Sequence, residues 1–418
     1  MQLNKSIDLA VIGGGPAGFM GAIKAAEDGA SSTVIYEATS KILEKVRISG
    51  GGRCNVINAC WEPSVLVTNY PRGERPLLGA FSRFAAGDAL NWFEARGLEL
   101  ISEEDGRIFP KSNSSLEVIK CLRDSANKAG VTYCTKMAVE EVKFSEKKDF
   151  LLKFRNQSVI NAKKVLIASG GGHIGRKIAS ALGHQIVLPV PSLFAFKLYP
   201  TFLNSCAGIS VDNVKLKLLC DSKSFKQEGR VLITHKGLSG PAILKMSAFA
   251  ARNLYLNKYN ASLMINWVGI NNEEIKHQLR LFRDNHSEIK FKKNYPFPKL
   301  SKRLWLHFIG VAGISTEARW SSLSNFQENL LAKVLGQDSH LMKGRGPFGE
   351  EFVTAGGVSL KEINFKSMES RICSGLYFAG EILDIDGVTG GFNFQHCWTS
   401  GWIAGRAIAR DLMVTPKM

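Results

Sequence analysis

The sequence lacks the patterns that hold metals and redox disulfides in proteins. Its eight cysteines are scattered, and none forms a CxxC pair or joins a histidine at zinc-ligand spacing. Five residues separate Cys54 from Cys60, whereas a redox-active pair of the CxxxxC type has four. We therefore expect free thiols, no metal site and no redox disulfide.

Long apolar runs are also missing. No stretch approaches the roughly 18 uncharged residues of a membrane-spanning helix. The first residues, MQLNKS, lead into a short apolar segment and then glycines, without the apolar core and cleavage site of a secretory signal. We expect a cytoplasmic protein with no membrane partner.

A glycine-rich turn follows the first apolar run. Leu9–Ile12 has the composition of a buried parallel strand, and Gly13, Gly15 and Gly18 then form GxGxxG. Pro16 and Ala17 open the helix, whose free N–H groups attract phosphate. Glu37 ends a second strand 19 residues after Gly18, where a carboxylate binds ribose hydroxyls. These features together predict a dinucleotide site.

A second block near the end of the sequence distinguishes FAD from NAD. The segment GLYFAGEILDIDGVTGGFN contains a strand ending at Gly380 and Glu381, and then a helix opening near Asn393. Such a helix directs its N-terminus at the flavin edge, where reduction builds negative charge. The same block supplies further expected cofactor residues: Asp386, Gly390, Gly391 and Phe392.

A third glycine run, RISGGGRCN, is expected to lie against the isoalloxazine, with a surface turn as the alternative. Its expected cofactor residues are Arg47, Ser49, Gly50, Gly51, Gly52, Arg53 and Asn55. Ser169 and Gly170 follow the apolar run Val165–Ala168, where we expect the chain to cross back over the same domain. We expect both to contact the cofactor as well.

The order of patterns predicts an α/β fold with a discontinuous Rossmann-like, glutathione-reductase-like FAD-binding domain. Residues 1–190 form its first part and 346–418 its second. Between them, residues 191–345 read as short strands and then helices, which predicts an inserted small β-barrel plus helical subdomain that contacts substrate. A further GxGxxG, at Gly170, Gly172 and Gly175, lacks a following strand with an acid, so a separate nicotinamide domain is not expected.

The net charge of +17 is concentrated in the insert. Val211–Arg345 contains 22 Lys and Arg against 10 Asp and Glu. Within it, Lys290–Arg303 interleaves lysines with aromatic residues, a pattern that suits phosphate contact and base stacking in RNA. The alternatives are a solvated linker and a surface that is basic for solubility.

The motifs GGGPAG, ISGGGRCN, VLIASGG, GGV, SMES and GLYFAGEILDIDGVTGGFN resemble the YhiN/BaiN-like flavoprotein family, also described as aminoacetone-oxidase-like NAD(P)/FAD-dependent oxidoreductases. The match runs from Ile7 to about Ala409. The resemblance implies an interrupted FAD domain. It also implies activities that include dihydrouridine synthesis in ribosomal RNA, steroid double-bond reduction and amine oxidation.

We predict from these observations an FAD-dependent oxidoreductase that uses NAD(P)H as a transient electron donor. Its leading substrate is a uridine in ribosomal RNA, with hydride added to one uracil carbon and a proton to its neighbour. The alternatives are a small-molecule flavin reductase or oxidase and an FAD-containing RNA-binding assembly factor. The proton-donor candidates are Cys54, His396 and His235, and for each a packing or loop role is the alternative.

Overall fold

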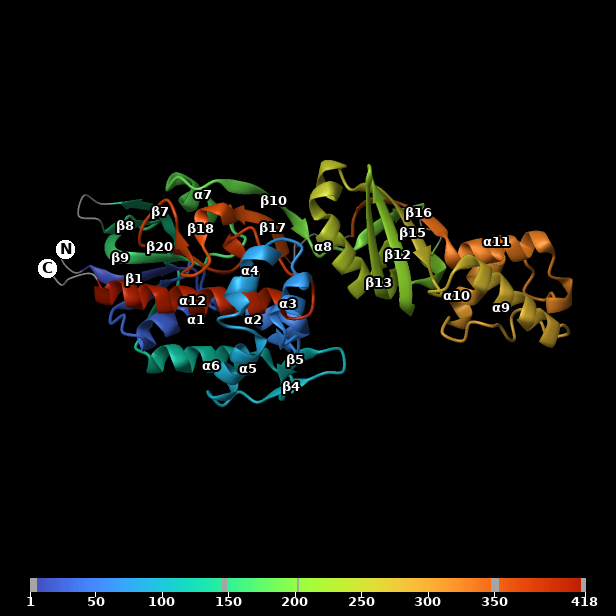
Figure 1. Cartoon of the computed structure of the whole chain (residues 1–418), viewed down its shortest axis with the longest axis horizontal. Coiled ribbons are helices and arrows are strands. Elements are labelled where there is room, and N and C mark those ends of the chain that lie inside the picture. Colours follow the sequence, from blue (N-terminus) through green and yellow to red (C-terminus); the bar gives the residue numbers. More distant parts are fainter. Residues whose placement is uncertain (1–5, 145–148, 201–202, 347–352, 415–418) are drawn as a thin grey trace. The chain divides into compact units, whose positions relative to one another are not determined.

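The computed structural model describes residues 6–144, 149–200, 203–346 and 353–414. The chain divides into two compact units. The first comprises Met1–Pro189 and Val353–Met418, and the second comprises Val190–Phe352. Figure 1 follows both units by colour along the chain.

The first unit is built on a parallel sheet. Its central strands, in spatial order, are β20 (Leu376–Phe378), β9 (Val159–Ile167), β1 (Ile7–Ile12), β2 (Thr33–Tyr36) and β6 (Thr132–Cys134). All four neighbouring pairs are parallel. The last segment of the sequence therefore completes a sheet that the first segment begins.

Antiparallel strands extend this sheet. β8 (Phe150–Phe154) pairs with β9 and with β7 (Val139–Phe144), while β19 (Glu369–Ser370) pairs with β20 and with β18 (Ile363–Asn364). A separate two-stranded sheet joins β10 (Ile186–Ser192) to β17 (Val353–Val358). Because β10 does not continue a parallel sheet, the glycines before α7 (His173–Ala181) do not open a second dinucleotide fold.

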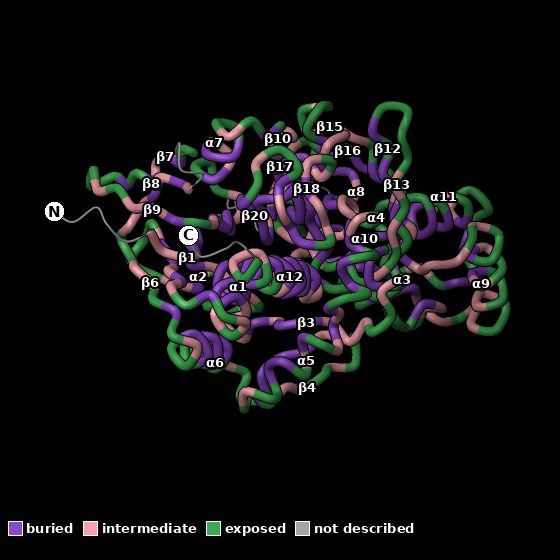
Figure 2. The backbone as a smooth tube through the Cα atoms, turned by 60° about the vertical axis from the view of Figure 1, so that its left-hand side comes forward, coloured by how far each residue is buried: buried purple, intermediate pink, exposed green. Residues whose placement is uncertain are grey.

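Two long helices, α1 (Pro16–Glu27) and α12 (Phe392–Val414), pack closely through glycines. A Cβ at Gly405 would lie 2.4 Å from the carbonyl oxygen of Gly21, and one at Gly401 would lie 2.5 Å from that of Ala17. No side chain fits at either position. Both helices are buried over most of their lengths (Figure 2).

The rest of the first unit is helical apart from one small sheet. Its helices are α2 (Glu44–Ile48), α3 (Pro63–Leu66), α4 (Glu74–Phe81), α5 (Ala86–Glu94) and α6 (Ser115–Lys128), with the short turns η1 (Ser49–Gly52), η2 (Val67–Asn69), η5 (Leu360–Glu362) and η6 (Gly380–Ile382). A three-stranded sheet contains β3 (Ile57–Asn58), β5 (Arg107–Pro110) and β4 (Leu100–Ser102).

The second unit contains a closed six-stranded barrel. Its order is β11 (Phe196–Tyr199), β14 (Gly237–Ser239), β13 (Lys223–Thr234), β12 (Ser210–Cys220), β15 (Asn260–Asn266) and β16 (Asp338–Arg345). The expected fold class, with a Rossmann-like domain and a small barrel, is thus confirmed. Because β11 and β16 pair with each other, the chain enters and leaves the barrel on neighbouring strands.

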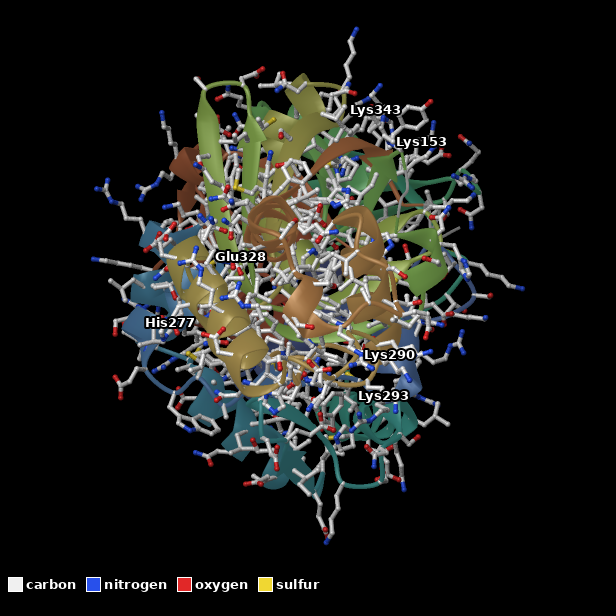
Figure 3. All side chains as sticks on the ribbon, turned by 90° about the vertical axis from the view of Figure 1, so that its right-hand side faces the viewer. Lys153, His277, Lys290, Lys293, Glu328 and Lys343 are labelled. Atoms are coloured by element: carbon white, nitrogen blue, oxygen red, sulfur yellow. The ribbon has the colours of Figure 1, made fainter. Side chains whose placement is uncertain are left out.

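Helices and two short turns complete the second unit: α8 (Pro241–Leu256), α9 (Asn272–Asn285), α10 (Lys302–Val311), α11 (Asn325–Gly336), η3 (Asn204–Cys206) and η4 (Trp320–Ser322). Glu328 on α11, labelled in Figure 3, is buried and bonds Arg280 on α9 at 2.7 Å. This ion pair ties two of the helices together.

The aromatic residues of the Lys290–Arg303 segment lie in the core of this unit. Phe291 is wholly buried, and it accepts a 2.8 Å hydrogen bond from the indole of Trp305, just beyond the segment. Tyr295 stacks on Trp305, with ring centroids 4.9 Å apart. The expectation that these rings stack on bases is therefore wrong, because the protein core already occupies them.

Within the described residues, no helix has the length and apolarity that crossing a bilayer requires. The same residues contain no cluster of three or more His, Cys, Asp or Glu side chains placed to hold a metal ion.

Candidate cofactor site

The turn between β1 and α1 leaves a helix N-terminus without a cap. Gly15 is the N-cap residue and Pro16 follows it, so no side chain satisfies the first N–H groups of α1. A Cβ built on Gly15 meets no atom within 4 Å, whereas one on Gly18 would lie 2.1 Å from the Gly13 carbonyl oxygen. Gly18 thus allows close packing, and Gly15 faces open space into which an anion fits.

Glu37 fixes the geometry of this turn. Its carboxylate follows β2 and accepts hydrogen bonds from the Gly14 N–H at 2.9 Å and the Thr39 N–H at 2.8 Å. Each oxygen keeps a second lone pair, and the side chain is only partly buried. The carboxylate can therefore bind a hydroxyl pair while it holds the loop.

The third glycine run forms a tight left-handed turn. Gly50, Gly51 and Gly52 have φ values of 57°, 69° and 87°, which favour glycine. A Cβ on Gly51 or Gly52 would meet nothing within 4 Å. The Leu43 N–H, just before α2, donates to the Gly14 carbonyl at 2.8 Å, so the turn at α1 is joined to the helix that leads into this run.

The two arginines of this run have protein partners. Arg47 pairs with Glu44 on the same helix. Arg53 bonds Glu103 at 2.5 Å and the Asn113 side chain at 2.8 Å, and lies over the Phe109 ring at 3.9 Å. Arg53 therefore anchors the glycine turn to the β4–β5 hairpin.

At the other end of the chain, Gly380 connects β20 to α12. Its N–H donates to Ser400 Oγ at 2.9 Å, and its carbonyl oxygen lies 3.2 Å from His396 Nε2. Burial lowers the pKa of His396 to about 4, so this imidazole is neutral at physiological pH. It donates from Nε2, and its Nδ1 has no partner in the described structure.

The N-terminus of α12 is held by contacts across the sequence. Asn393 exchanges hydrogen bonds with Gly387, at 2.8 and 2.9 Å. Tyr70 donates to the Phe392 carbonyl at 2.6 Å, and Asn58 donates to that of Gly390 at 3.0 Å. A Cβ on Gly391 would lie 2.7 Å from the Ile57 backbone. Gly391 thus lets β3 approach the helix.

Glu381 and Asp386 both have protein partners. Glu381 accepts from the Thr354 N–H at 2.8 Å, and burial raises its pKa. Asp386 is fully buried and forms an ion pair with Arg72. These placements indicate that both acids shape the loop before α12.

Asn55, Ser169 and Gly170 complete the expected set. The Asn55 side chain bridges the Ile57 carbonyl at 2.9 Å and the Gly391 N–H at 3.0 Å in the orientation that satisfies both. Ser169 Oγ is buried without a partner, and Gly170 follows it with φ 65°. An uncapped helix, three open glycines and an orphaned hydroxyl fit the phosphates and sugars of a dinucleotide.

The three proton-donor candidates lie in different surroundings. Cys54 is wholly buried, and burial raises the pKa of its thiol to about 12. A residue that contacts a cofactor or substrate would be open to solvent in the bare protein, so this placement favours packing. His235 is exposed in the turn between β13 and β14 of the second unit.

The structure also reveals supporting residues that the sequence does not indicate. Arg72, Tyr70, Asn58 and Trp398 connect α12 and its loop to the segment 56–72. Their partners are more than 300 positions away in the sequence, and no local motif marks them.

Comparison with known proteins identifies the family of the chain. The family model described as the HI0933-like protein Rossmann domain matches residues 7–407. A 3-dehydro-bile acid delta(4,6)-reductase of Clostridium scindens is 28% identical over 96% of this chain and 98% of its own length. A ribosomal RNA dihydrouridine synthase of Haemophilus influenzae is 28% identical over the same shares of the two proteins.

Solved structures show the same fold at low identity. A 3-ketosteroid-delta4-(5alpha)-dehydrogenase from Rhodococcus jostii superposes with a TM-score of 0.52 at 14% identity, covering 98% of both chains. The open form of a flavocytochrome c3 fumarate reductase gives 0.51 at 16% identity, covering 98% of this chain and 79% of the other.

Proposed function

The chain belongs to the HI0933-like protein family and is an FAD-dependent oxidoreductase, and we propose that it reduces a carbon–carbon double bond conjugated to a carbonyl. When bound, FAD supplies the hydride from its reduced N5. The observation that carries the FAD assignment is the uncapped N-terminus of α1 beside Gly15 and the open Gly51–Gly52 turn.

The residues of this chain have distinct parts in the proposal. The N–H groups at the start of α1 bind the pyrophosphate, and Glu37 orients the adenosine ribose. Gly51 and Gly52 leave room for the flavin ring. The N-terminus of α12 stabilises the negative charge that builds on the flavin edge, and NAD(P)H is the proposed electron donor.

The leading substrate is a uridine in ribosomal RNA. The names of the two relatives describe activities that act on double bonds, in a uracil base and in a bile acid. Most of the net positive charge of this chain lies in Val211–Arg345, and positive charge favours a polyanionic substrate over a steroid. This charge is what supports RNA over the bile acid.

The test is a nucleoside comparison. Ribosomal RNA from wild-type and deletion cells is digested and examined by mass spectrometry, and we expect one dihydrouridine to be absent from the deletion strain. The purified protein, given NAD(P)H, should restore it in RNA from that strain. Unchanged RNA, together with turnover of a 3-oxo-steroid enone, would instead assign the small-molecule activity.

A further inference from the structure

Three neighbouring lysines on the outer face of the barrel form no ion pair within the part of the chain that the structure describes. Lys215 and Lys217 are on β12, and Lys226 is on β13. They line a depression whose other members include Glu228, Met264 and Asn266. We call Lys215, Lys217 and Lys226 the barrel lysine face.

Strand register forces these charges together. Lys217 lies directly opposite Lys226 in the antiparallel pair, and Lys215 is two residues along the same strand. Directly opposed side chains have Cβ atoms about 5 Å apart, and like charges at that separation repel. Glu228 lies opposite Lys215 but forms no ion pair with it within the described residues.

Several other cations of this unit form ion pairs. Lys290 bonds Glu317 at 2.8 Å, and Lys292 pairs with the same carboxylate. These two lysines lower the pKa of Glu317 to about 2. Arg319 pairs with Glu288, and Arg230 bonds Asp212 at 2.6 Å. Lys290 is labelled in Figure 3.

From this contrast, and resting on the proposed function, we propose that the barrel lysine face binds the sugar–phosphate backbone of the RNA substrate. Repelling ammonium groups that form no ion pair gain most from a neighbouring phosphate. No aromatic residue lines the depression, so contact is to the backbone rather than by base stacking.

The experiment compares two variants with the same net charge. In the first, Lys215, Lys217 and Lys226 are all replaced with Gln. In the second, the matched control, Lys290, Lys292 and Lys302 are replaced with Gln. Binding of a fluorescein-labelled single-stranded RNA is measured by anisotropy between about 50 and 200 mM salt.

We expect the barrel variant to lose about tenfold or more in affinity and about 2 from the slope of log affinity against log salt, since three single-strand phosphate contacts are removed. The control should remain within a few-fold of wild type. Both should keep the flavin spectrum, because none of the substituted residues is in a cofactor motif. The melting temperature of the barrel variant should be equal or higher, since a like-charge pair is removed.

Equal affinities of the two variants would overturn the proposal, as would binding of the wild type to phosphatidylglycerol vesicles but not to RNA. Dihydrouridine formation is measured separately. If the wild type forms dihydrouridine and the barrel variant binds RNA as tightly as the wild type, the RNA-binding role of the barrel lysine face is wrong and the proposed function stands. If only the barrel variant loses RNA binding and the wild type forms no dihydrouridine, the barrel lysine face binds RNA but the proposed function is wrong.

Discussion

Gly15 and Gly18 stand in one motif, but a side chain would meet different surroundings at each. At Gly15, where φ is −89°, an added Cβ meets no atom within 4 Å. We expect Gly15→Val to fold normally and to lose FAD affinity by at least about a hundredfold, because the side chain occupies the pyrophosphate position. Titration with FAD and a thermal melt measure the two effects.

The matched variant at Gly18 should behave differently. A Cβ there lies 2.1 Å from a backbone oxygen, so Gly18→Val should lower stability as well as FAD content. A Gly15→Val protein that is yellow after purification would contradict the phosphate site.

The buried thiol of Cys54 leads to a second prediction. With a pKa of about 12 and no exposure, it is a poor proton donor. We expect Cys54→Ala to retain both flavin half-reactions in stopped-flow measurements, at the cost of about 1 kcal/mol of stability. A loss of ~10²–10⁴-fold in flavin reoxidation alone would return Cys54 to the mechanism as the general acid.

From the burial of His396 we predict that the stability of the folded chain decreases in acid. The His396 pKa of about 4 in the folded chain lies below the ordinary value of 6.5, so only the unfolded chain takes up the proton between these values. The contribution of His396 to the free energy of unfolding is fully present above pH 6.5. It falls by about 3 kcal/mol as the pH drops to 4. The melting temperature of His396→Gln should depend less on pH, and exposed His235→Gln should match wild type.

At the scale of elements, the crossing of α1 and α12 depends on missing side chains. A Cβ at Gly405 would lie 2.4 Å from a carbonyl oxygen of α1. We expect Gly405→Ala to cost about 1–3 kcal/mol and to reduce FAD retention, because both helices begin at the cofactor site. Gly310→Ala in α10 is the control, since its Cβ meets nothing within 4 Å and should stabilise by about 0.5–1 kcal/mol. Denaturant melts of both variants test this.

The elements around glycine motifs could be predicted because their signals are local. The helix expected to open at Pro16 and Ala17 is α1, and the one expected to open near Asn393 is α12. Strands β14 and β16 could not be predicted: β14 has three residues, and β16 (DSHLMKGR) has little β-branched or aromatic content. The residues of the cofactor site likewise divide into those with a local sequence signal and those without one. Glycine positions were evident, while Arg72 and Tyr70 act through partners distant in sequence.

At the scale of the molecule, the barrel unit should fold alone. Its core of buried residues lies wholly within Phe194–Met342, and β11 pairs with β16 where the chain enters and leaves. We expect a fragment spanning residues 193–346 to show a cooperative melt whose midpoint is indifferent to FAD. The full chain should show a second transition that FAD raises. A fragment without cooperative unfolding would mean that the barrel depends on the first unit.

The split sheet also sets an order on biosynthesis. Strands β1, β2, β6 and β9 are translated first. At that point β20, which pairs with β9, and α12, which packs on α1, do not yet exist. The barrel segment is translated next, so it can fold while the nucleotide domain still waits for its closing strand. FAD, whose site needs both helix N-termini, can therefore enter only after α12 has left the ribosome. A nascent chain stalled before that point should be colourless, with Val165–Ile167 of β9 as an open sheet edge for chaperones to cover.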